Sequence, residues 1–107
     1  MDLVERIYTL SSGFPANERF GLTTQIRRAA VSVPSNIGEG SRRKRDKVFV
    51  NYLEIALGSQ AEVEVQLEIA ARLRFISASD YKGTRTDVEE IGRMLNGLIT
   101  SLEREKE

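Results

Sequence analysis

Positively charged side chains are the residues of this chain whose spacing points most directly to chemistry. Residues 27–47 hold seven cations and two carboxylates, although the 107-residue chain has a formal net charge of zero. The seven cations are Arg27, Arg28, Arg42, Arg43, Lys44, Arg45 and Lys47. Clusters of lysine and arginine bind the phosphates of nucleic acids, with an affinity that falls steeply as salt is added. The competing interpretation is a solvated loop between two helices.

Two missing residue types exclude most catalytic chemistry. The chain has no cysteine and no histidine, which removes thiol nucleophiles, disulfides, Ser-His and Cys-His pairs and the usual zinc ligands. Carboxylate pairs and Ser-Lys pairs remain chemically available, but any helical surface rich in Glu and Lys offers such pairs by chance. We therefore expect no catalytic residues, no cofactor and no metal.

The segment GEGSRRK at residues 38–44 places glycines beside cations, as phosphate-binding loops also do. A Walker loop requires the spacing G-x-x-x-x-G-K-[ST] directly after a β-strand. No strand-like alternation precedes these glycines, and Lys44 does not fall at the lysine position of that motif. No aromatic residue interrupts the cations, so stacking on single-stranded bases is not indicated. The pattern favours contact with the backbone of a structured RNA or DNA.

Apolar residues at helical spacing predict an all-α protein that forms one domain over residues 1–107. The simplest way to bury the apolar stripes is an antiparallel up-down-up-down four-helix bundle. Before the last helix, Ser77 is predicted to act as the N-cap, with Asp80 completing a capping box. The predicted helices cover about residues 1–12, 22–40, 46–74 and 78–104.

The location of the protein is predicted from segments that the sequence lacks. No apolar run approaches the roughly 20 residues that a helix needs to cross a bilayer. The first ten residues, MDLVERIYTL, are amphipathic and contain acids, unlike a secretory signal. We therefore expect a cytoplasmic protein with no membrane partner.

Pro34 lies within the second predicted helix. The stripe of apolar residues in this helix keeps its phase on both sides of the proline, so the helix is expected to continue through it with a kink. The alternative is a break at Val33, with residues 34–36 as a turn. Gly40 is a candidate C-cap before the cations. The stripe consists of Leu22, Ile26, Ala29, Val33 and Ile37.

The third predicted helix has two apolar faces. One is a heptad seam for the bundle core: Phe49, Leu53, Ala56, Gln60, Val63, Leu67 and Ala70. The other comprises Val48, Tyr52, Ile55, Val65 and Ile69. This second set either widens the core-facing stripe or contacts another subunit. We favour the subunit contact and expect four residues at an oligomer interface: Tyr52, Ile55, Val65 and Ile69.

Structural roles are expected for several other residues. Gly58, Gly92 and Gly97 lie inside predicted helices, where glycine is unfavourable, so we expect each to mark the close approach of a neighbouring backbone. Glu39 and Arg93 are expected to be partly buried. We interpret them as an ion pair that joins the kinked helix to its neighbour.

Three segments carry a resemblance to a known family: FPANERFGLTTQIRRAAVSVPSNIGEG, YLEIALGSQAEVEVQLEIA and IGRMLNGLITSLE. The chain resembles the four helix bundle protein family, whose members are small bacterial proteins encoded by intervening sequences of 23S ribosomal RNA genes and by many chromosomal loci. The resemblance implies that Pro34 lies inside a kinked helix and that the bundle assembles into a ring, commonly a homopentamer. The chain is also similar to the accessory variability protein of diversity-generating retroelements, a basic pentameric barrel that binds nucleic acid and a reverse transcriptase.

Two features depart from the family pattern. Members usually have about ten further residues in the first helix, so Met1 is a candidate internal start. Gly38 stands where alanine is usual, which is expected to loosen the end of the second helix. The leading hypothesis is a ring-forming bundle that binds RNA or DNA through its cations without catalysis. The alternative is an adaptor or accessory subunit whose cations dock on an acidic protein partner, and an enzyme is the third hypothesis.

Overall fold

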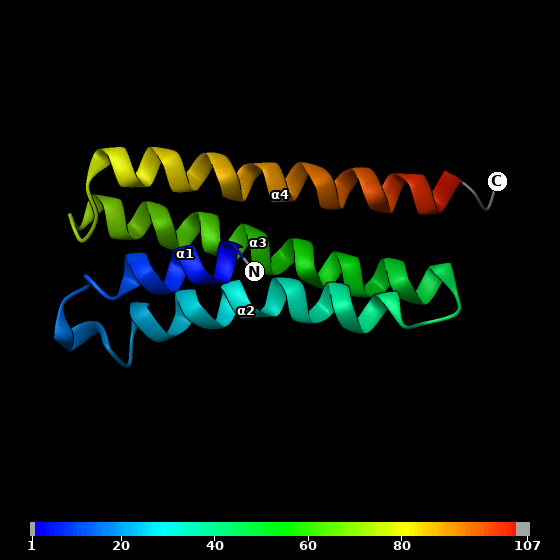
Figure 1. Ribbon diagram of the computed structural model, residues 1–107, viewed down its shortest axis with the longest axis horizontal. Helices are drawn as coiled ribbons and strands as arrows, with labels where there is room; N and C mark the ends of the chain where they lie inside the picture. Colours follow the sequence, from blue (N-terminus) through cyan, green and yellow to red (C-terminus); the bar gives the residue numbers. More distant parts are fainter. Residues whose placement is uncertain (1, 105–107) are drawn as a thin grey trace.

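The structure consists of four α-helices in the predicted order. The computed structural model describes residues 2–104, in which the all-α prediction is confirmed and no strand occurs. The elements are α1 (Asp2–Ser11), a 3₁₀ turn η1 (Ala16–Glu18), α2 (Leu22–Ser41), α3 (Asp46–Arg72) and α4 (Ala78–Arg104) (Figure 1). Residue 1 and residues 105–107 lie outside the described part, so the expected start of the first helix at Met1 stays a prediction.

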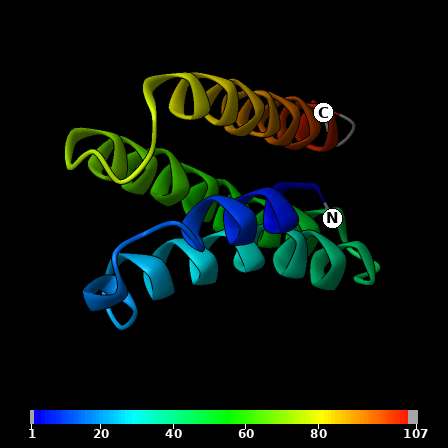
Figure 2. The same cartoon turned by 60° about the vertical axis from the view of Figure 1, so that its left-hand side comes forward.

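Each helix packs beside the next one along the chain. Ser32 on α2 meets Ser59 on α3, while Gly40 near the end of α2 meets Tyr52 near the start of α3, so the residue numbers run in opposite directions along this pair. Figure 1 shows the same alternation for α3 and α4. In Figure 1, α1 lies along only the first half of α2, and Figure 2 shows α3 between α2 and α4. The other half of the bundle therefore contains three helices.

The heptad seam predicted for α3 faces the core. Leu53, Ala56, Val63, Leu67 and Ala70 are all fully shielded from solvent, and Gln60 is buried with them. The stripes of α2 and α4 pack against this seam, because residues three and four apart lie on one side of a helix.

The apolar residues of α4 also recur at heptad spacing, namely Val88, Ile91, Leu95, Leu98 and Leu102, a pattern that predicts a seam facing the core. Leu98 does not have the buried position that this seam predicts. Its side chain remains exposed, since the ten-residue α1 is too short to cover the length of the 27-residue α4.

Pro34 lies inside a continuous α2, so a break at Val33 is wrong. Proline at this position leaves the carbonyl of Ala30 without its helical donor. The side chain of Asn36 donates a hydrogen bond of 2.8 Å to a different carbonyl, that of Ser32. The kink itself stays a prediction. Gly40 is not the C-cap, because α2 continues to Ser41 and Arg42 follows it in a helical conformation. Gly40 is instead buried against α3.

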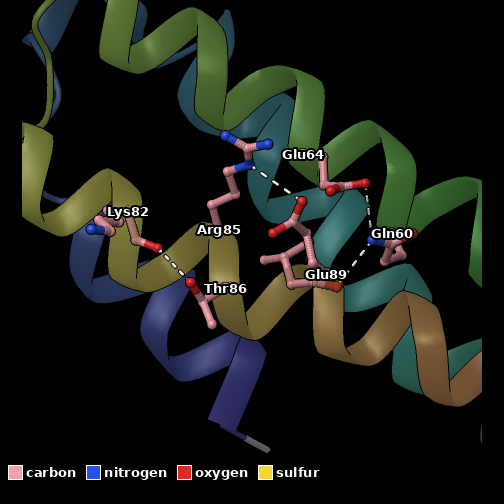
Figure 3. Close-up of polar contacts among 7 residues, drawn as sticks. Gln60, Glu64, Lys82, Arg85, Thr86 and Glu89 are labelled. Carbon is pink, nitrogen blue, oxygen red and sulfur yellow. Dashed lines mark hydrogen bonds and ion pairs between the residues drawn. The ribbon is translucent and has the colours of Figure 1, made fainter.

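A buried amide joins α3 to α4. The Gln60 side chain donates hydrogen bonds to the Val88 carbonyl at 3.0 Å and to a Glu64 carboxylate oxygen at 3.1 Å (Figure 3). A Cβ at Gly92 would lie 2.8 Å from the amide nitrogen of Gln60, so this glycine does mark a close approach, although to a side chain rather than to backbone. For Gly58 and Gly97 no such approach occurs within the single chain, since no atom of residues 2–104 outside the adjacent backbone of the same helix lies within 4 Å of a Cβ there.

Candidate nucleic-acid interface

The end cluster consists of the four cations Arg42, Lys44, Arg45 and Lys47. It occupies the connection between α2 and α3 and the first turn of α3, at one end of the bundle (Figure 1). All four side chains are exposed, and within residues 2–104 none of them forms an ion pair. Because α2 ends at Ser41 and α3 begins at Asp46, the short connection holds these charges close together.

Arg43 belongs to the same segment but is occupied by neighbouring side chains. Its guanidinium lies 2.8 Å from a Glu39 carboxylate oxygen and donates a 3.1 Å hydrogen bond to the Tyr52 hydroxyl. The guanidinium also lies 5.3 Å from the centre of the Tyr52 ring. Tyr52 is therefore half-buried at the edge of the basic segment, and an aromatic ring that the sequence pattern did not reveal lies beside the cations.

Arg27 and Arg28 do not join the end cluster. Arg42 follows Arg28 by fourteen positions along and just past α2, a rise of about 21 Å. Arg27 is committed to α1, because its Nε donates to the Ser11 hydroxyl at 2.8 Å and its guanidinium lies 4.5 Å from the ring centre of Tyr8. Arg28 is exposed and has no carboxylate partner among the described residues.

The positive surface has an acidic border. Glu54 and Glu103 line the same shallow hollow as Lys47, where the start of α3 meets the end of α4. An approaching polyanion is therefore attracted to the α2–α3 connection and repelled from the neighbouring side of α4.

The expected ion pair between Glu39 and Arg93 is wrong within the single chain. Glu39 pairs with Arg43, and Arg93 pairs with Glu90 at 2.7 Å on its own helix. Both side chains are more than half exposed. The hydrogen bond and charge of Glu90 raise the pKa of Arg93 above its ordinary value. Residues three or four positions apart on one helix are neighbours on its surface and can pair without help from the tertiary structure. Glu39 and Arg93 each have such a local partner, and they do not pair with each other.

The second apolar face of α3 points away from the core. Ile55 and Val65 are 54% and 58% exposed, and Ile69 is 40% exposed. A wide core-facing stripe is therefore excluded for these three residues. The subunit contact stays a prediction, and Tyr52 differs from the other three expected interface residues because it packs against Gly40 and Arg43.

Sequence reasoning missed a second partly apolar surface between α1 and α2. Tyr8 and Val31 are 43% and 39% exposed there, beside Arg28, in a hollow of about 480 Å³. The sequence feature that could have revealed this surface is Val31, an apolar residue outside the core-facing stripe of α2. Phe20, also missed, is an exposed aromatic residue in the connection before α2.

A metal site and a membrane-spanning helix are two other features to consider in the described part of the chain. Residues 2–104 contain no group of three or more acidic side chains placed to hold a metal ion. None of the helices in that range combines the length and apolar character needed to cross a membrane.

Comparison with known proteins matches nearly the whole chain. The model of the family described as 23S rRNA-intervening sequence protein matches residues 1–97. Among solved structures, the chain is similar to a protein of unknown function from the S23 ribosomal protein family of Bacteroides thetaiotaomicron VPI-5482, at 29% identity and a TM-score of 0.85. That similarity covers 92% of each chain. No curated protein matches the sequence.

Proposed function

Because the chain belongs to the 23S rRNA-intervening sequence protein family, we propose that it is a non-enzymatic, cytoplasmic protein that assembles into a ring and binds structured RNA or DNA. The end cluster is the proposed contact with phosphates. A pentamer and a likeness to the accessory variability protein remain predictions from the resemblance.

The observation that carries this proposal is the set of four cations at the α2–α3 connection that form no ion pair with any residue from 2 to 104. Free cations can release condensed counterions from a nucleic acid, whereas a cation already paired with a carboxylate gains little from a phosphate. Arg43 is held by Glu39 and Tyr52, so we assign the binding to Arg42, Lys44, Arg45 and Lys47.

Assembly would convert weak contacts into useful affinity. Four phosphate contacts from one chain give modest binding on their own. A closed ring with parallel bundle axes presents one end cluster from every subunit at the same end of the assembly. A single nucleic acid that reaches several clusters then binds with a high effective concentration at each additional site.

The test is a titration of a structured RNA and of a duplex DNA at several salt concentrations. With four contacts, we expect the affinity of one chain for a duplex to fall about a hundredfold between 50 and 200 mM salt, since each contact contributes a slope of about 0.9. The double variant R42Q/K44Q should weaken binding and lower the slope by about two contacts.

The matched control is the double variant R85Q/R93Q. It removes the same number of positive charges, but from the exposed face of α4, where both arginines pair with glutamates. We expect its affinity to remain close to that of the unmodified protein. Equal losses for the two variants would show that net charge alone is responsible. Binding that does not change with salt would exclude the proposal, and a protein partner retained after nuclease treatment would favour the adaptor role instead.

A further inference from the structure

We propose that two different surfaces of this chain are the two halves of one subunit contact: the outer α3 face of one copy docks on the α1–α2 face of a second copy. The outer α3 face consists of Ile55, Gly58, Glu62, Val65 and Ile69. The α1–α2 face consists of Tyr8, Arg28 and Val31. This inference rests on the proposed assembly, and it identifies the surfaces that form it.

The outer α3 face has the spacing of a helix-packing seam. Its residues follow one another at intervals of three, four, three and four, which is the heptad pattern of helices that pack side by side. The apolar members are exposed in the single chain. One helix thus has two seams, of which its own fold covers only one.

Gly58 leaves the middle of this face open to the close approach of a second helix. Glycine in a helix interior costs about 1 kcal/mol relative to alanine, and apart from the adjacent backbone of α3 itself no atom of residues 2–104 lies within 4 Å of a Cβ at this position. The fold itself gains nothing from the missing methyl group. A helix of a second copy that lies close to α3 at Gly58 would need that space.

The α1–α2 face is complementary to the outer α3 face in charge. Glu62 and Glu54 are exposed on or beside the outer α3 face, and neither forms an ion pair within residues 2–104. On the α1–α2 face the free charge is that of Arg28, beside the apolar surface of Tyr8 and Val31. Each face therefore combines exposed apolar surface with an unpaired charge of opposite sign to the other.

The two faces also lie at the same level along the bundle. The hydrogen bond of 2.8 Å between Ser59 and Ser32 sets the register of α3 against α2. Val31 is next to Ser32 in α2, and Gly58 is next to Ser59 in α3. A contact between two different faces of identical subunits generates a ring or a filament, according to whether the rotation closes. Faces at equal height require no shift along the axis, which favours a closed ring.

The test is a charge exchange followed by sedimentation of the full chain without nucleic acid. The variants Arg28→Glu and Glu62→Arg should each weaken self-association by about tenfold or more, because like charges then face each other. The double variant R28E/E62R should regain assembly, since every contact between neighbouring copies then again joins a carboxylate to a guanidinium, whatever the number of subunits in the ring. A contact between two copies of the same face cannot be rescued by this double variant.

Apolar variants locate the contact. Val65→Gln should weaken self-association, whereas Met94→Gln, which changes an equally exposed residue of α4, should not. Gly58→Ala should likewise weaken assembly, while Gly97→Ala, also in open space, should leave it intact. Circular dichroism of each variant confirms that the helices are retained.

The outcomes separate this inference from the proposed function. If the unmodified protein sediments as a 12.0 kDa species at micromolar concentration, the proposed assembly fails and this contact fails with it. If it self-associates but neither charge variant has an effect, or if only Met94→Gln disrupts it, the contact assigned here is wrong while the assembly stands.

Discussion

Gly40 of α2 lies directly against Tyr52 of α3. A Cβ at residue 40 would be 2.6 Å from the Cβ of Tyr52 and 2.8 Å from the Cδ1 atom of Phe49. Both distances are far below van der Waals contact, so the two helices can approach this closely only because residue 40 has no side chain. The contact brings the Tyr52 ring to the edge of the basic connection, where it also receives the Arg43 guanidinium.

Gly40→Ala should destabilise the protein even though alanine is the better helix former. Overpacking of a tight site costs about 1–3 kcal/mol, which exceeds the gain of about 1 kcal/mol in helix propensity. The control is Gly38→Ala, two residues earlier on the same helix, where nothing lies within 4 Å of a Cβ. It should stabilise the protein by about 1 kcal/mol. Denaturant unfolding of both variants measures the difference, and equal effects would contradict the packing argument.

Arg74→Gly should increase the free energy of unfolding by about 1 kcal/mol. Arg74 follows α3 with a φ of 62°, a left-handed conformation that favours glycine. The backbone amides of Arg74 and Phe75 bond to the carbonyls of Ala71 and Ala70, the pattern of a Schellman motif. Thermal and denaturant unfolding measure the change. The substitution Arg72→Gly, within the helix, should have the opposite sign.

Arg27→Met should lower the free energy of unfolding by about 1–2 kcal/mol, because it removes the stacking on Tyr8 and leaves the buried Ser11 hydroxyl without its donor. Arg28→Met is the matched variant, since its exposed side chain has no ion-pair partner in the described part of the chain. We expect that change to stay within about 0.5 kcal/mol, measured at a concentration too low for self-association. Similar losses for both arginines would show that Arg27 has no special structural role.

Gln66→Met should stabilise the protein by about 1 kcal/mol. The Oε1 atom of Gln66 is buried and accepts no hydrogen bond from the described residues. Methionine has a similar length and no oxygen to desolvate. Gln60→Met is the control, because it removes an amide whose hydrogen bonds to Val88 and Glu64 are formed, and it should destabilise. A loss of stability at both positions would mean that Gln66 has a partner in solution.

The region around Pro34 shows what the local pattern of residue types can predict. The apolar stripe through Ile26 and Val33 predicted that α2 continues past the proline, and it does. The cap was equally readable, since the Asp80 amide bonds to the Ser77 hydroxyl as predicted. The course of α2 and the Ser77 cap depend on residues within four positions of one another, so a linear pattern contains the information needed to predict them. The predicted C-cap at Gly40 failed because that glycine is required by the packing of α2 on α3.

Contacts between residues that are distant in the chain could be identified only from the tertiary structure. The order of residues was enough to predict that cations gather between Arg42 and Lys47 and that α3 has an apolar face beyond its core seam. Only the folded chain decided that Arg27 is held by α1, that Arg43 is held by Glu39 and Tyr52, and that Gly40 packs while Gly58 lies open. The physical reason is that charge and size are properties of single residues, whereas pairing and contact depend on which helices pack together and in which register.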